Sequence, residues 1–221
     1  GQFSDKSYGF REGRNCRQAV QRAQEYIKDG NRWVVEMDFS KFFDRVNHDI
    51  LMDRVSRVID DKAILKLIRR YLNAGIMEDG LVSPRLEGVP QGSPLSPLLS
   101  NIMLTELDRE LEERGLNHVR YADDCNIYVK SEKAAQRVLT NITKYVEGTL
   151  KLRVNRDKSG TFRPRDSVFL GYTFSKANCT RIIVAQKSVK RLWTKLHKIF
   201  NTARGTSLGW TIKTITPVLR G

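Results

Sequence analysis

The sequence is poor in cysteine and histidine and lacks long apolar runs. Its three cysteines, Cys16, Cys125 and Cys179, include no closely spaced pair, which argues against a disulfide framework or a cysteine-based zinc site. Its three histidines share no metal-ligand spacing, and no run of about 18 apolar residues could cross a membrane. The first ten residues are polar and mixed, unlike a signal peptide. We therefore expect a protein of a reducing compartment with no membrane partner.

Acidic residues are scarce relative to basic ones. The 221 residues contain 39 Lys and Arg against 25 Asp and Glu, so the formal net charge is +14. Such an excess of positive charge favours a polyanionic partner, most simply a nucleic acid, over a merely solvated surface. Hydrophobic residues make up 40% of the chain, enough for a buried core.

Apolar periodicity predicts helices and strands in irregular alternation. Residues 75–92 are rich in Gly and Pro and predict an irregular segment with one short strand pair, and Ser96 is the expected N-cap of the helix that follows. This order predicts an α+β fold with an antiparallel sheet packed on helices. The expected helices are 15–29, 47–58, 61–73, 97–114, 132–150 and 186–203, and the expected strands are 33–38, 118–122, 125–129, 168–174 and 181–184.

Three carboxylates stand where predicted strands end. Asp38 ends the first strand, and Asp123 with Asp124 occupies the tip of the hairpin. Adjacent acids raise each other's pKa unless a cation neutralises them, and Mg²⁺ prefers carboxylate oxygens. The alternative is an exposed Asp-Asp turn, because Asp favours turns.

The motifs around these acids resemble one enzyme family. Residues 38–44 read DFSKFFD, residues 89–102 read VPQGSPLSPLLSNI, and residues 121–124 read YADD. In this order and with this spacing, the motifs resemble those of the reverse transcriptases encoded by group II introns. The resemblance implies a right-hand polymerase palm: partial fingers in 1–32, a palm in 33–185 with fingers-side helices in 47–90, and the start of a truncated thumb in 186–221.

The resemblance also implies the roles of the acids. Asp38 and Asp123 would bind two Mg²⁺ ions, with Mn²⁺ as an alternative, and Asp124 would be the third acid of the site. The backbone carbonyl of Phe39 would complete one metal's coordination. Lys158 would lie near the pyrophosphate leaving group, the alternative being one more solvated lysine.

Other positions would contact substrates. Phe43 would pack under the incoming sugar and reject a 2′-hydroxyl, so that dNTPs are preferred, and Gln91 and Gly92 would touch the incoming nucleotide; core packing and a plain turn are the respective alternatives. The apolar positions 189, 192, 196 and 199 of the last predicted helix are expected to pack in a core. Primer or template contacts are implied for Tyr121, Leu170, Gly171, Tyr172, Arg11, Arg14, Lys190 and Arg191.

The sequence therefore predicts an RNA-directed DNA polymerase of a group II intron-type element, with RNA template, DNA primer, dNTPs and group II intron RNA as partners and a homodimer left open. The expected location is the bacterial cytoplasm or nucleoid before an organellar matrix. The alternatives are a non-enzymatic RNA-binding splicing scaffold, or a related retron, CRISPR or defence reverse transcriptase. The fingertip segment before Tyr8 and the maturase part that the family carries are not among the 221 residues. We therefore expect a fragment, with weak or absent polymerisation on its own.

Overall fold

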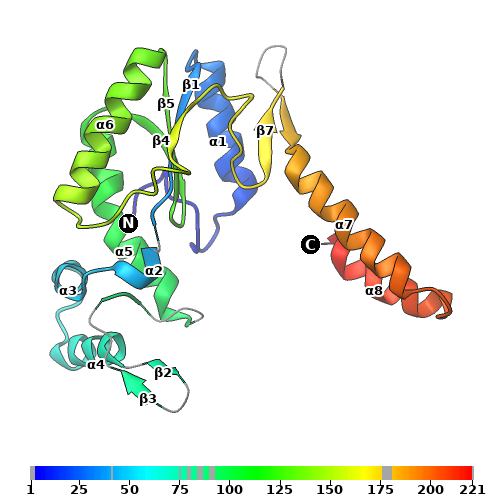
Figure 1. Ribbon diagram of the computed structural model, residues 1–221. Helices are drawn as coiled ribbons and strands as arrows, with labels where there is room; N and C mark the ends of the chain where they lie inside the picture. The colour runs from blue at the N-terminus through cyan, green and yellow to red at the C-terminus, as the bar shows by residue number, and fades with distance from the viewer. Residues whose placement is uncertain are drawn as a thin grey trace.

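The computed structural model describes residues 3–40, 42–74, 76–78, 81–83, 87–89, 93–175 and 181–220 (Figure 1). The helices are α1 (Cys16–Lys28), α2 (Phe42–Arg45), α3 (His48–Ser56), α4 (Lys62–Asn73), α5 (Leu95–Glu113), α6 (Glu132–Gly148), α7 (Gln186–Thr202) and α8 (Leu208–Arg220). The strands are β1 (Trp33–Met37), β2 (Ile76–Glu78), β3 (Leu81–Ser83), β4 (Asn117–Tyr121), β5 (Asp124–Val129), β6 (Gly160–Phe162), β7 (Tyr172–Phe174) and β8 (Ile182–Val184).

The main sheet has four antiparallel strands in the order β4-β5-β1-β6. The two central strands, β5 and β1, are far apart in the chain, and Met37 lies opposite Cys125 in their ladder. The hairpin β4–β5 pairs Tyr121 with Asp124 across its turn. The predicted antiparallel sheet and α+β class are confirmed.

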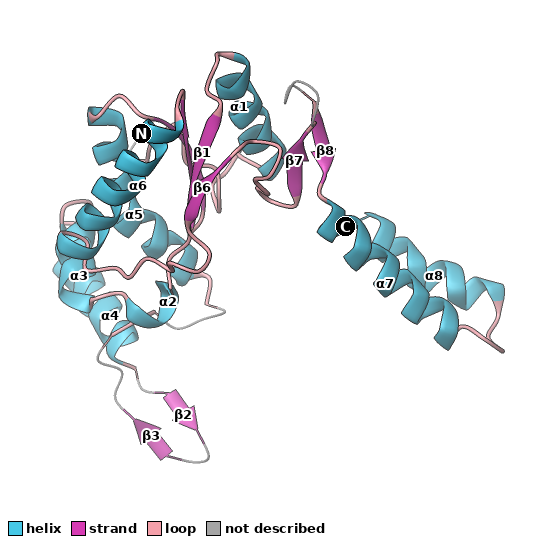
Figure 2. Ribbon diagram, turned by 45° about the horizontal axis from the view of Figure 1, so that its top comes forward, coloured by secondary structure: helices cyan, strands magenta, loops and turns pink. Residues whose placement is uncertain are grey.

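Helices cover both faces of this sheet (Figures 1 and 2). Because successive side chains of a strand point to opposite faces, Val34 and Val35 enter different cores. Val34 packs in the cluster that includes buried residues of α1, and Val35 packs in the larger cluster that includes α5 and α6. The α1 face and the α5 face of the sheet are therefore chemically separate environments.

Side-chain caps explain where four helices begin. Asn15, Asn47, Asp61 and Ser131 each accept a hydrogen bond from a backbone N–H in the first turn of α1, α3, α4 and α6. Each cap satisfies a donor that has no partner within its helix and contributes about 1 kcal/mol. All four helices begin within one residue of the starts expected from the sequence.

The predicted start of α5 is wrong. Ser96 lies inside the helix, and the N-cap is Pro94, which makes no side-chain cap hydrogen bond. The helix can begin earlier because the first four N–H groups of a helix have no intrahelical acceptor, so Pro97 sacrifices no hydrogen bond in the first turn.

Three shorter elements also differ from the prediction. Strand β1 ends at Met37, one residue before Asp38. The expected strand 168–174 is reduced to β7, because residues 170 and 171 both adopt positive φ and turn the chain back. Strand β6 is a three-residue edge strand on β1 that is too short to show periodicity (Figure 2).

The C-terminal helices extend away from the sheet and pack against each other (Figure 1). The expectation that the apolar stripe of α7 forms a core is wrong: no residue of α7 is buried, and Leu192 is 40% exposed. Helix α8 was not expected, because it is rich in β-branched residues and Pro217 lies within it. No helix among the described residues is long and apolar enough to cross a membrane.

Candidate active site

Asp38 lies immediately after the central strand β1, and a later loop holds its backbone. Its amide donates to Ser159 Oγ at 3.0 Å, and its carbonyl oxygen accepts from the Asn155 amide at 2.9 Å. The same loop brings Lys158 close, with Nζ 3.7 Å from Asp38 Oδ2. Both side chains reach solvent, so the pair is open to a ligand. Lys158 and Asp38, predicted to share the site, do lie together.

The hairpin β4–β5 carries the other two acids. Its turn consists of Ala122 and Asp123, and Asp124 is the first residue of β5. Continuing the register of β1 and β5 by one residue beyond Met37 and Cys125 sets Asp38 across from Asp124. The structure thus brings the ends of two central strands together although 85 sequence positions separate Asp38 from Asp123.

The environment of Asp124 is strongly negative. Removal of water by the surrounding protein raises the pKa of Asp124 to about 7, and repulsion from Asp123 adds to it. Glu36 and Asp38 raise this pKa further, whereas Lys158 lowers it. One lysine therefore opposes three neighbouring carboxylates.

Glu36 is a fourth acid of this face that the sequence reasoning missed. It stands two residues before Asp38, so strand alternation puts both on the α1 face of the sheet, and its partner across the ladder is Asn126. Burial raises the pKa of Glu36, while hydrogen bonds from Ser167 and the Val168 amide, the latter at 3.2 Å, lower it. The i, i+2 spacing from Asp38 was the signal that could have identified it.

The residues assigned to the primer gather on the same face. Tyr121, Leu170 and Tyr172 all pack, partly exposed, against the cluster that α1 forms with the sheet. Gly171 has φ +83°, and its carbonyl oxygen accepts from the Ala185 amide at 2.9 Å. The turn at 170–171 is thereby tied to the start of α7, next to the acids' side of the sheet. Contact with a primer stays a prediction.

The two arginines near the N-terminus contact their own segment. Arg11 Nη1 donates to the carbonyl oxygens of Ser4 and Ser7, the latter at 2.9 Å. Arg14 forms an ion pair with Asp5 at 2.9 Å and lies over the Tyr8 ring. These contacts order residues 4–14, and template binding by either arginine stays a prediction.

The remaining predicted residues are described only in part. Phe39 is buried and its ring centroid lies 6.2 Å from that of Phe42. Phe43 is in α2, but its side chain, like the whole of Gln91 and Gly92, lies outside the described residues. Lys190 and Arg191 are exposed on α7, in a C-terminal stretch, 167–221, that contains no Asp or Glu.

The acids are suited to a hard cation by chemistry rather than by their present spacing. Among the residues described, no three Asp, Glu, His or Cys side chains are gathered closely enough to hold a metal ion. Burial first, and then repulsion from Asp123, Glu36 and Asp38, raises the pKa of Asp124, and a bound cation would offset both effects. Carboxylate and carbonyl oxygens are the donors Mg²⁺ takes, so the donor set fits a divalent cation.

An antiparallel sheet whose two central strands end in acids, with helices packed on both faces, is the palm of a template-directed polymerase. The chain belongs to the reverse transcriptase (RNA-dependent DNA polymerase) family, whose model matches residues 1–174. The architecture agrees: the structure of telomerase from Candida albicans with a fragment of telomeric RNA superimposes with a TM-score of 0.63 at 14% identity, over 97% of this chain and 42% of that one.

Two relatives are similar to this chain in sequence. Protein YkfC of Escherichia coli is 35% identical over 209 residues, which cover 77% of this chain and 55% of YkfC. Group II intron-encoded protein LtrA of Lactococcus lactis is 39% identical over 107 residues, or 48% of this chain and 18% of LtrA. The chain thus spans about half the length of the first and less than a fifth of the second.

Proposed function

We propose that this chain is the catalytic palm of an RNA-directed DNA polymerase of a group II intron-type element. The observation that carries the proposal is the position of Asp38 across from Asp124, at the ends of the two central strands of a reverse transcriptase-family sheet. Lys158 supplies a cation beside the same acids. The reaction would be attack of a primer 3′-oxygen on the α-phosphate of a dNTP, with pyrophosphate leaving.

Asp38, Asp123, Asp124 and the Phe39 carbonyl would hold two Mg²⁺ ions, or Mn²⁺ in their place. Bound ions would promote deprotonation of the attacking hydroxyl and neutralise charge on the phosphates. The chain's own residues would do the rest: Lys158 would donate a proton or offset charge at the leaving pyrophosphate. Phe43 would select the sugar by excluding the 2′-hydroxyl, the group that distinguishes an rNTP from a dNTP.

The surface beside the acids suits a primer–template duplex. Tyr121, Leu170 and Tyr172 offer partly exposed apolar groups on the α1 face, and the acid-free stretch 167–221 supplies basic residues for phosphates. The relative named as a group II intron-encoded protein extends the proposal to an intron RNA partner and a role in splicing in the whole protein. Cysteines without pairing motifs suit a reducing compartment, for which we propose the bacterial cytoplasm.

Primer extension on an RNA template with dNTPs and Mg²⁺ tests the proposal in the whole protein. The Asp123→Asn, Asp124→Asn double variant should lose synthesis. The matched control is Asp60→Asn, Asp61→Asn, another adjacent pair, because the amide oxygen introduced at position 61 retains the capping acceptor for α4. Synthesis retained in the first variant would contradict the assignment of the acids. Failure of the wild-type protein to extend any primer would favour the non-enzymatic RNA-binding scaffold.

A further inference from the structure

The hairpin that carries Asp123 and Asp124 contains a strained residue. Ala122 adopts φ +57°, in the left-handed region, and precedes Asp123 in the two-residue turn. Glycine is the usual residue at such a position, because a Cβ is disfavoured there. A non-glycine residue keeps this conformation only when its surroundings determine it. Something must therefore hold Ala122.

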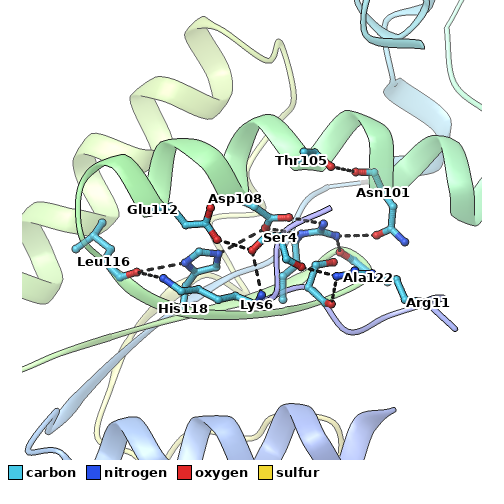
Figure 3. A network of polar contacts seen from close by, with 12 residues as sticks. Ser4, Lys6, Arg11, Asn101, Thr105, Asp108, Glu112, Leu116, His118 and Ala122 are labelled. Atoms are coloured by element: carbon cyan, nitrogen blue, oxygen red, sulfur yellow. Dashed lines mark hydrogen bonds and ion pairs between the residues drawn. The ribbon is translucent and has the colours of Figure 1, made fainter. Parts of the chain in front are cut away.

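The holding group is the fully buried guanidinium of Arg120. Its Nη1 donates to the Ala122 carbonyl oxygen at 2.8 Å. Its Nε and Nη2 donate to the two carboxylate oxygens of Asp108 on α5, at 2.8 Å and 2.6 Å. Asp108 is fully buried as well, so the bidentate pair anchors the guanidinium to a helix of the α5 face (Figure 3). From there it reaches the turn behind the catalytic acids.

A second layer surrounds the same turn. The Asn101 side chain on α5 accepts from Arg120 Nη1 at 3.0 Å (Figure 3). It also donates to the Gly9 carbonyl oxygen at 2.9 Å. Gly9 in turn lies against Ala122, since a Cβ built on Gly9 would be 2.3 Å from the Ala122 nitrogen. The turn is held between a buried guanidinium and a glycine backbone.

A purely stabilising role explains this pair poorly. Replacing a buried ion pair with apolar residues is often neutral or stabilising, because desolvation offsets the attraction. The pair instead fixes the orientation of Arg120. Its planar guanidinium donates to Asp108, Asn101 and Ala122 at once, which a lysine could not do. The acids lie on the opposite face, so Arg120 touches no substrate in this arrangement.

We propose that Arg120, oriented by Asp108 and Asn101, is a positioning residue that holds Ala122 in its left-handed conformation and so sets the places of Asp123 and Asp124. This inference rests on the proposed polymerase function for its catalytic readout. It assigns a role to residues that the motif comparison did not single out. A displacement of about 1 Å at reacting groups can cost about a hundredfold in rate.

The test separates positioning from folding by removing both charges together. In the whole protein, Asp108→Leu with Arg120→Met should fold with a melting temperature close to wild type and lower kcat about a hundredfold, with a smaller effect on the KM for dNTP. Adding Ala122→Gly to the double variant should raise its kcat about tenfold, because glycine adopts the conformation of this turn without support. The matched control, Glu110→Gln with Arg114→Gln, removes an exposed ion pair of α5 and should leave kcat unchanged.

Two kinetic results would overturn the proposal: wild-type kcat in the folded double variant, or a loss of kcat that Ala122→Gly does not reduce. Hydrogen–deuterium exchange over residues 121–124 measures how often the turn opens and does not rely on catalysis. Exchange that rises about tenfold in the double variant supports the proposal even where no DNA is made, and unchanged exchange refutes it. A wild-type protein that synthesises no DNA would refute the proposed function alone.

Discussion

The smallest change that should displace the hairpin that carries Asp123 and Asp124 is Gly9→Ala. Alanine at this position would place a Cβ 2.3 Å from the Ala122 nitrogen and 3.0 Å from the Tyr121 carbonyl carbon. Contacts under 3.0 Å do not occur at real Cβ atoms, so the two segments must separate by about 0.7 Å. Both contact atoms are backbone, and no rotamer change can relieve the clash.

The displacement acts on a turn that already depends on its neighbours. The Gly9 carbonyl is bonded to Asn101, and the Tyr8 amide donates to the Arg120 carbonyl oxygen at 2.8 Å, so the segment cannot move away without losing these bonds. We expect the free energy of unfolding to fall by about 1–3 kcal/mol, as for other overpacked sites. Primer extension should fall further than stability explains, by about tenfold to a hundredfold, because Asp123 follows the displaced residue.

Thermal denaturation and single-turnover primer extension, measured on the same preparations, check this. The matched control is Gly148→Ala near the end of α6, where a Cβ meets no atom within 4 Å and the backbone is not left-handed. The free energy of unfolding of that variant should rise by up to about 1 kcal/mol, with no change in the rate of primer extension. A Gly9→Ala protein that extends primers at the wild-type rate per folded molecule would refute the reasoning.

Three further predictions concern single side chains. Lys158→Met should lower kcat about a hundredfold with little change in the KM for primer, and Lys158→Arg should recover part of it; equal rates in presteady-state extension would contradict a role at the leaving group. Phe43→Ala should raise rNTP incorporation relative to dNTP about tenfold or more, measured by competition, whereas unchanged discrimination would remove Phe43 as the sugar gate. Burial raises the pKa of Asp108, but the Arg120 guanidinium and His118 together lower it by more, so its net pKa is below the ordinary value. The stability that this carboxylate contributes is thus present above about pH 4 and is lost as pH falls through the lowered pKa. Urea titrations should show that the free energy of unfolding falls less steeply with acid in Asp108→Asn than in the wild type.

The sequence contained enough to predict the fold class and the positions of the three acids beside strand ends. Alternating apolar residues identified β1 and the β4–β5 hairpin, and apolar residues at helical spacing identified α1, α3, α4 and α6. Local signals of this kind depend on neighbours within a few positions, so they survive in a single sequence. They failed at β6 and α8, where the strand is too short and the helix is rich in β-branched residues.

Long-range partners could not be predicted in the same way. Glu36 shares a face with Asp38 by strand alternation, but its acceptance of the Val168 amide joins positions 132 residues apart. Likewise, Asp108 looks like any acid on an amphipathic helix until the fold sets it against Arg120. Burial decides what such residues do, and burial follows from topology.

The two faces of the hairpin carry side chains with different roles. On the α1 face, several acids raise the pKa of Asp124 and one lysine lowers it, an arrangement that is unfavourable in the absence of a cation and useful in its presence. On the α5 face, Arg120 and Asp108 are paired and fully buried, so their charges neutralise each other and hold the turn. Strand alternation sends Arg120 and Cys125 to one face and Tyr121 and Asp124 to the other. Five consecutive residues, 120–124, therefore contain both the acids and the arginine that positions them.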